Sequence, residues 1–212
     1  MDNFNQKMKE SLMGLKKREK LLLHTCCAVC AGGALAREFS METASQKSRG
    51  IISKNRLTDF FDITLFFYNP NIDPQEEYLK RAGELAKLES AFPIRHIVIA
   101  EYKPDEFQAE AQGYEGEREG GGRCGACIRL RLLKTAQYAK RNGFDRFSTV
   151  LTAGSRKSVS LNHDGERAGK QLGVPFLPAD FKKENGFAIA NKTAERLGLY
   201  RQNYCGCIYS KK

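Results

Sequence analysis

The chain has 212 residues, of which 41% are apolar, enough for one compact domain with a substantial core. Its formal net charge is +10, spread along the whole chain, which favours nucleic acid first and a membrane surface second, or reflects no specific partner. No stretch approaches the ~18 apolar residues of a membrane span, and the N-terminal segment is too polar for a secretory signal. We therefore expect a cytoplasmic protein, in which structural disulfides are rare.

Apolar and amphipathic segments alternate along the chain and predict strands and helices in turn. In chain order we expect a peripheral, weakly attached helix over 1–18, a strand over 20–24, a helix over 31–39, a basic surface loop over 41–59, a strand over 62–67, a helix over 75–89, a strand over 96–100, a helix over 104–112, a glycine-rich loop over 113–123, a helix over 124–141, a strand over 144–151, a helix over 158–172, a short strand over 174–177, a helix over 188–197 and a cysteine-rich tail over 199–212.

This alternation predicts a single α/β domain over residues 1–212, with a Rossmann-like three-layer fold. The sheet should be mostly parallel, with helices on both faces. Ligands of such sheets bind beyond the carboxyl ends of the strands. The segments 26–27, 69–71 and 151–157 each follow a predicted strand, so we expect all three at that edge.

All seven cysteines fall in three short clusters. Cys26, Cys27 and Cys30 follow the first predicted strand, and Cys124 and Cys127 form a CxxC motif at a predicted helix start. Two thiolates from the first cluster and two from the CxxC motif fit a [4Fe–4S] cluster or a structural zinc. Cys30 is then left over as a core cysteine, a substitute ligand or a ligand of a second metal.

The CxxC motif also fits dithiol exchange, because a helix N-terminus and the adjacent Arg123 are expected to lower the pKa of its thiols. Cys205 and Cys207 form a CxC motif, whose disulfide closes a small, strained and easily reduced ring. That motif is typical of a redox-active pair, a second metal site or an inert tail. His24 precedes the first cluster and is either a functional group or a structural hydrogen-bonding residue.

Two segments near the C-terminus mix charged and aromatic residues, 180–183 and 200–204. They either hold a nucleotide through phosphate contacts and base stacking or form solvated surface.

Several long motifs occur together in the chain, in the order LLLHTCCAVC, FFYNPNIDPQEEYLKR, GERE followed by RCGACIRLRL, ADFKKENG and LYRQNYCGCIYS. In this order they resemble the cobalamin-independent epoxyqueuosine reductases (QueH type) from about Leu21 to Ser210. The chain departs from the family pattern at Val29, where proline is usual, at residues 153–156 and in a longer 41–59 connection. None of these departures removes a cysteine.

The resemblance implies reduction of the epoxide of epoxyqueuosine at the wobble position of tRNA, which gives queuosine. It implies that Cys26, Cys27, Cys124 and Cys127 bind a [4Fe–4S] cluster. It further implies a redox-active disulfide between Cys205 and Cys207. An additional mononuclear iron or other metal ion is implied without assigned ligands, and the electron donor is unknown.

Two aromatic side chains, Tyr68 and Tyr204, are candidates for stacking on a flipped-out anticodon base. The residues alone also leave two other functions open. One is a zinc-stabilised RNA-binding module without catalysis. The other is a thiol–disulfide oxidoreductase that uses the CxxC and CxC motifs in exchange.

Overall fold

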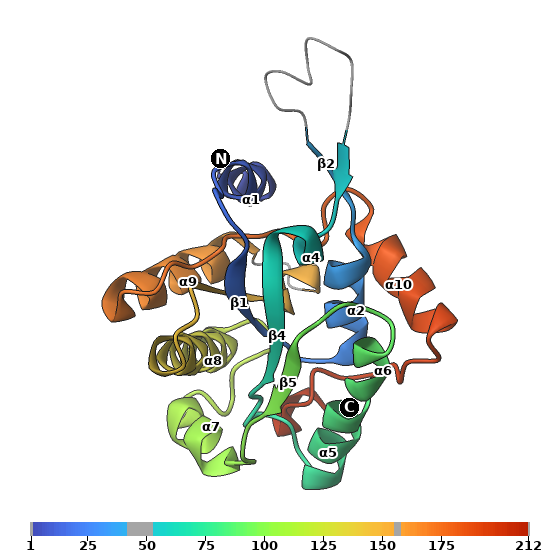
Figure 1. The fold of residues 1–212 in the computed structure, drawn as a ribbon. Coiled ribbons are helices and arrows are strands. Elements are labelled where there is room, and N and C mark those ends of the chain that lie inside the picture. Colours follow the sequence, from blue (N-terminus) through green and yellow to red (C-terminus); the bar gives the residue numbers. More distant parts are fainter. Residues whose placement is uncertain (1, 42–52, 155–157, 212) are drawn as a thin grey trace.

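The computed structural model describes residues 2–41, 53–154 and 158–211, and its central element is a four-stranded parallel sheet (Figure 1). The strands are β1 (Glu19–His24), β4 (Phe61–Phe67), β5 (His96–Ile99) and β6 (Arg146–Thr149), in the spatial order β5-β4-β1-β6. The helices and 3₁₀ turns are α1 (Phe4–Met13), α2 (Ala28–Ala36), α4 (Leu57–Phe60), α5 (Gln75–Gly83), α6 (Ala86–Glu89), α7 (Pro104–Ala111), α8 (Gly122–Arg141), η1 (Val150–Ala153), α9 (Ser158–Leu172), α10 (Gly186–Arg196) and η2 (Ile208–Ser210).

Helices cover both faces of this sheet, which confirms the predicted α/β fold. Figure 1 shows α7, α8 and α9 on one side and α2, α5, α6 and α10 on the other. Successive side chains of a strand point to opposite faces. Leu21 and Leu23 of β1 accordingly join a core cluster with residues of α2, α5 and α10, whereas Leu22 joins a second cluster with residues of α8 and α9.

Two predicted strands differ from the structure, one in its length and one in its existence. Residues 150–153 form η1 rather than continuing β6, because the Thr149 hydroxyl accepts a hydrogen bond from the Leu151 N–H (3.2 Å) and turns the chain. The strand predicted over 174–177 is wrong: Phe176 makes only an isolated parallel bridge to Phe147. The neighbouring Pro175 has no N–H to donate, so a longer ladder cannot form there.

The N-terminal helix is shorter than predicted and is not weakly attached. α1 buries Phe4, Met8 and Leu12, and the carbonyl oxygen of the Asn5 side chain accepts a hydrogen bond from the buried Arg37 (2.5 Å). An amphipathic face packed on the domain outweighs the polar composition of this segment.

The segment predicted as a surface loop over 41–59 is partly ordered. β2 (Phe39–Met41) pairs antiparallel with β3 (Ser53–Asn55), and α4 follows directly. Residues 42–52 lie outside the described part of the chain. The prediction of a loop is therefore wrong for 53–55 and 57–60, which lack the periodic pattern of longer elements.

The carboxyl ends of β1, β4 and β6 meet at one edge, as predicted. The His24 Nδ1 atom lies 2.8 Å from the Thr149 hydroxyl, and the Asn69 side-chain amide donates to the Thr25 carbonyl (2.9 Å). Residues 155–157 lie outside the described part. The C-terminal tail returns to this edge, where the backbone N–H of Asp73 donates to Gly206 (2.8 Å). Among the described residues, no helix combines the length and apolar character needed to cross a membrane.

Candidate functional site

Three cysteines, the cysteine trio of Cys26, Cys27 and Cys30, gather where β1 ends and α2 begins. Their sulfur atoms all lie within 4.8 Å of one another. Cys27 is the N-cap of α2, and its sulfur accepts a hydrogen bond from the Cys30 backbone N–H (3.4 Å). This cap starts the helix three residues earlier than predicted and turns the three sulfurs toward one point. Cys30, left over in the sequence, therefore belongs to the trio.

The three thiols of the trio differ in the direction of their pKa shifts. Hydrogen bonds from the Cys26 and Cys30 thiols hold the pKa of Cys27 well below its usual value, helped by the Cys30 backbone N–H and the Gln202 amide. Hydrogen bonding to Cys27 raises the pKa of Cys26, and hydrogen bonding to both neighbours raises that of Cys30. Of the three thiols, Cys27 is therefore the one whose surroundings favour the deprotonated form that binds metals.

The CxxC pair, Cys124 and Cys127, occupies the first turns of α8. The Cys124 sulfur accepts from the Gly120 backbone N–H (3.2 Å), while Cys127 is buried against Phe107 and Ala111. Burial raises the pKa of Cys127 to about 11, so the lowered pKa expected from the helix N-terminus is wrong for this thiol.

Arg123 does not serve the CxxC pair as predicted. Its guanidinium donates to the carbonyls of Tyr114 (2.9 Å), Glu115 (2.9 Å) and Glu117 (2.7 Å), and it stacks on Tyr209. It therefore fastens the glycine-rich loop before α8 and the tail after η2.

The tail pair, Cys205 and Cys207, is held mainly through backbone contacts. Arg81 of α5, paired with Glu77 (2.7 Å), donates to the carbonyls of Cys205 (3.0 Å) and Tyr204 (3.2 Å). The Cys205 side chain is exposed, whereas Cys207 is half-buried and packs against the cluster of Phe107, Ala111 and Cys127. All seven cysteines are free thiols. The tail pair thus lies beside the CxxC pair, and its redox-active disulfide stays a prediction.

His24 has a structural role. It is fully buried, with Nδ1 2.8 Å from the Thr149 hydroxyl and Nε2 3.1 Å from the Tyr68 carbonyl. Burial, together with the nearby Arg131 charge, lowers its pKa to about 3. A neutral imidazole that ties the ends of β4 and β6 to β1 fits the structural alternative.

Sequence reasoning missed Arg131, and it expected Asn69 at this edge without assigning it a contact. Arg131 lies one turn after Cys127, and its Nε donates to the Cys127 carbonyl (3.4 Å). Its Nη1 donates to the Asn69 side-chain oxygen (3.3 Å), and Asn69 in turn donates to Thr25 next to the trio. The i, i+4 spacing from Cys127 was the available signal, since it places both side chains on one helix face.

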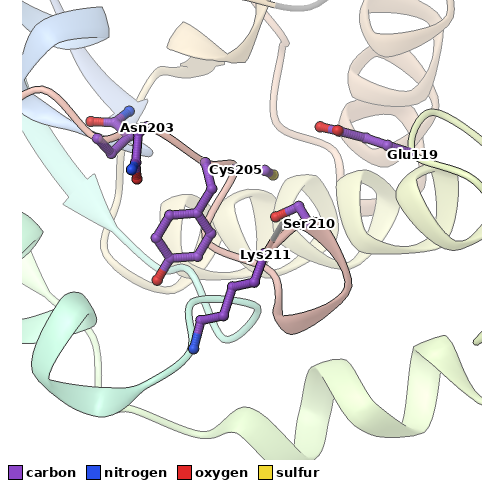
Figure 2. A pocket seen from close by; sticks show the side chains of 7 residues that line it. Glu119, Asn203, Cys205, Ser210 and Lys211 are labelled. Carbon is purple, nitrogen blue, oxygen red and sulfur yellow. The ribbon is translucent and has the colours of Figure 1, made fainter.

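A cavity of about 840 Å³ opens beside Cys205, within the size range of small-ligand sites. Figure 2 shows Asn203, Cys205 and Ser210 along one side, with the Glu119 side chain extending toward them from the other. The full lining is Glu119, Gln202, Asn203, Tyr204, Cys205, Ser210 and Lys211.

The remaining residues predicted to contact a nucleotide differ in their exposure. Tyr204 lines the cavity, but Tyr68 is buried, stacks on Phe66 and donates a hydrogen bond from its hydroxyl to Glu106. Asp180 is also buried and accepts a hydrogen bond from the Ser158 hydroxyl (3.0 Å). The proposed stacking role is therefore wrong for Tyr68, and Asp180 supports the fold.

The donors of the trio are sulfur atoms alone, the chemistry that zinc, copper(I) and iron–sulfur centres select. Among the described residues, it is the one group of three or more His, Cys, Asp and Glu ligand atoms this close together. The sulfur atoms of the CxxC pair are not within 4.8 Å of all three sulfurs of the trio. Arg131 is nevertheless close enough to both Cys26 and Cys127 for their charges to act on it. The site therefore fits a thiolate-bound metal centre.

Comparisons with known proteins point to one family. The family model described as "Epoxyqueuosine reductase QueH" matches residues 21–212. A protein of that name from Streptococcus pyogenes serotype M1 is 37% identical over 92% of this chain and 71% of its own. Another from Staphylococcus aureus is 33% identical over 98% and 83%, and one from Dehalococcoides mccartyi is 30% identical over 91% and 92%.

A solved structure shares the fold. It is the U34-tRNA thiolase NcsA from Methanococcus maripaludis with its [4Fe-4S] cluster, which matches 99% of this chain and 67% of that one with a TM-score of 0.53. At 15% sequence identity this likeness concerns the fold alone. The family match and the similar relatives carry the assignment, and the chain belongs to the epoxyqueuosine reductase QueH family.

Proposed function

We propose that this protein reduces the epoxide of epoxyqueuosine in tRNA to the cyclopentene of queuosine. The observation that carries the proposal is the family match over residues 21–212, which spans the trio, the CxxC pair and the tail pair. A zinc-stabilised RNA-binding module and a thiol–disulfide oxidoreductase are not favoured, because the similar relatives are named as reductases of epoxyqueuosine.

Cys26, Cys27, Cys124 and Cys127 are the proposed ligands of a [4Fe–4S] cluster. The sulfur-only donor set and the Cys27 thiolate support this assignment. Cys30 shares the trio and is the alternative to Cys26 as a ligand. When bound, such a cluster supplies electrons singly at a potential tuned by nearby charge and hydrogen bonds.

The tail pair is the proposed source of the electrons and protons that the reaction consumes. Removing the epoxide oxygen consumes two electrons and two protons, breaks both C–O bonds, and forms one C=C bond and one water. Oxidation of the Cys205 and Cys207 thiols to a disulfide releases two electrons and two protons. The exposure of Cys205 beside the cavity supports contact with substrate, and the packing of Cys207 on the cluster that contains Cys127 supports electron transfer between the tail pair and the proposed metal centre.

The proposed substrate is a tRNA, which the basic surface of this protein binds. The proposed location of the reaction is the cytoplasm. The net charge of +10 suits contacts to phosphates, which weaken as salt increases. The cavity beside Cys205 is large enough for a nucleoside, and Tyr204 in its wall supplies an aromatic ring for the base.

The test is anaerobic purification followed by a single turnover. The protein should be brown, contain iron and acid-labile sulfide, and convert tRNA-bound epoxyqueuosine to queuosine, measured by mass spectrometry of the digested nucleosides. A colourless protein with stoichiometric zinc and no product would exclude the reductase.

A further inference from the structure

Arg131 is a buried cation without a carboxylate partner. Arg131 lies on α8 and is buried, with 5% of the residue exposed. Its two hydrogen bonds reach neutral oxygens, the Cys127 carbonyl (3.4 Å) and the Asn69 side chain (3.3 Å). Across the described ranges, no Asp or Glu oxygen forms an ion pair with it.

Other buried arginines of this protein are satisfied differently. Arg37 pairs with Glu184 (3.1 Å) and Arg81 with Glu77 (2.7 Å), while Arg123 donates to three carbonyls. Burying a charge without a counter-charge is strongly unfavourable. The carbonyl and amide partners of Arg131, at 3.4 and 3.3 Å, supply no negative charge to offset that cost.

The cysteines around Arg131 supply that charge when they are deprotonated, as thiols are when they bind a metal. Cys127, Cys205, Cys26 and Cys124 all lie close enough to Arg131 for their charges to act on its guanidinium. The neighbours of Arg131 thus come from the trio, the CxxC pair and the tail pair together.

Arg131 also links two of these segments mechanically. It lies on α8 one turn beyond Cys127, and its guanidinium holds the Asn69 side chain. Asn69 donates to the Thr25 carbonyl (2.9 Å), which directly precedes Cys26. One hydrogen-bonded path therefore runs from the CxxC pair to the trio through this arginine.

We propose that Arg131 is the charge-balancing and positioning residue of the cysteine centre. It holds α8 at a fixed distance from the β1–α2 loop and stabilises the more negative, reduced form of a thiolate-bound redox group. The proposal rests on the proposed function for the identity of that group. A positive charge close to a redox centre raises its reduction potential, because reduction adds an electron.

The first experiment compares reduction potentials of anaerobically reconstituted proteins by redox titration monitored by electron paramagnetic resonance. Arg131→Gln should shift the potential to more negative values, and Arg131→Lys should stay close to the wild type. Arg37→Gln, which removes a buried arginine far from the cysteines, is the matched control and should lose stability without a shift. An unchanged potential in Arg131→Gln, or equal shifts in the Gln and Lys variants, would overturn the proposal.

A second variant keeps Arg131 in place and cancels its charge. Asn69→Asp sets a carboxylate at the oxygen that Arg131 already contacts and removes the amide that donates to the Thr25 carbonyl, so its potential should also fall. This variant decides the question if Arg131→Gln does not fold, and an unshifted potential in it would overturn the proposal.

The two proposals fail separately. Wild-type protein that converts epoxyqueuosine without any reducible metal group would overturn the role of Arg131 and leave the function standing. A potential that depends on Arg131 in a protein without turnover on tRNA would support the role of Arg131 and contradict the function.

Discussion

The cysteine trio and the tail pair use the same side chain in opposite settings. The trio sits at the junction of a central strand and a helix, where Thr25 donates to Phe66 (2.8 Å) and Ala31 to the Cys27 carbonyl (3.2 Å). The tail pair lies on a segment without helix or strand between α10 and η2. Backbone hydrogen bonds of the strand and helix therefore fix the trio, while the tail is held by the Asp73 N–H, which donates to the Gly206 carbonyl (2.8 Å), and by side chains such as Arg81.

This difference separates two tasks that thiols perform. A metal ligand must stay within tenths of an ångström of its position, which suits sulfurs set by a strand end and a helix cap. A redox pair must change its bonding, which suits a segment held at its edges by Arg81 and by the Lys211–Asp73 ion pair (2.9 Å). The same molecule thus offers rigid thiols for binding and adjustable thiols for exchange.

Serine substitutions of one cysteine from each region should have the largest effects, and these effects should differ between the trio and the tail pair. Cys27→Ser removes the thiolate of the trio, so iron content, colour and turnover should all be lost. Cys205→Ser should abolish turnover while iron and sulfide remain at wild-type levels. Metal analysis and nucleoside mass spectrometry on both proteins measure these outcomes.

Cys30→Ala completes that set, because it tests the member of the trio that is proposed only as the alternative to Cys26. Retained iron identifies Cys26 and Cys27 as the ligands from the trio. Loss of iron in Cys205→Ser would show instead that the tail binds metal and that the two regions do not differ in task.

Releasing the tail without touching a thiol should lower activity and spare the metal. Arg81→Gln removes the donor to the Cys205 and Tyr204 carbonyls and leaves Glu77 without its ion-pair partner. A displacement of about 1 Å at a reacting group costs up to ~100-fold in rate, so we expect a fall of about 10- to 100-fold in single-turnover rate.

Arg201→Gln is the matched control for Arg81, since Arg201 lies on the same tail but is exposed and contacts only the Asn191 side chain (2.7 Å). Its rate should remain within about twofold of the wild type, in keeping with the small effect of surface substitutions. Iron loss in Arg81→Gln would mean that the tail stabilises the metal centre as well.

Two glycines test whether stability and activity divide between the regions. Gly33 lies where α2 contacts α10, and an added Cβ would meet the Ala190 Cβ at 2.6 Å. Gly33→Ala should therefore cost about 1–3 kcal/mol of unfolding free energy. Gly206 has a φ of +109°, and its Cβ would meet Ile72 at 2.9 Å and Arg81 at 3.0 Å. Gly206→Ala should lower turnover more than stability, because it strains only the tail.

Gly83→Ala provides the control for both glycines, because its Cβ would meet nothing within 4 Å at the end of α5. It should leave stability and turnover unchanged or slightly raise the unfolding free energy. Equal losses of stability in the Gly33 and Gly206 variants would contradict the division. Denaturant unfolding and single-turnover assays give the two readouts.

The strands around the trio could be predicted because their apolar runs are continuous, as in KLLLH and DITLFF, which is the pattern of a buried parallel sheet. Placing the cysteines at the carboxyl edge followed from that topology. Inclusion of Cys30 did not follow, because it depends on Cys27 capping α2, a local geometry that spacing alone leaves open.

The tail and its surroundings were less accessible to sequence reasoning. Nothing in the sequence pairs Arg81 with carbonyls more than one hundred residues away, because such contacts depend on how the tail folds back. The predicted stacking of Tyr68 on a base is wrong, because the burial of a residue just after a strand depends on the helix that covers it. Arg131 was readable only as a helix-face neighbour of Cys127, and its burial required the structure.

Tyr78 gives a final, smaller test of how firmly the tail rests on the core. Its buried hydroxyl donates to the Ala100 carbonyl (2.5 Å), and burial raises its pKa to about 12. Its ring packs on Tyr102, which donates to the Ile72 carbonyl beside the tail. The folded-state pKa lies above the usual value of about 10, so the stabilisation is complete below pH ~10 and is lost as pH rises through ~12.

Unfolding free energy should accordingly fall by up to about 1 kcal/mol per pH unit between pH ~10 and ~12, somewhat less than the ~1.4 kcal/mol of a fully shifted group. Tyr78→Phe, which cannot ionise, should be less stable at neutral pH but show a shallower decline. Denaturant titrations of both proteins across this range measure the slopes. Identical slopes would mean that Tyr78 has the same pKa in the folded and unfolded states. The alkaline weakening would then lie elsewhere, and the tail would rest on the core independently of this tyrosine.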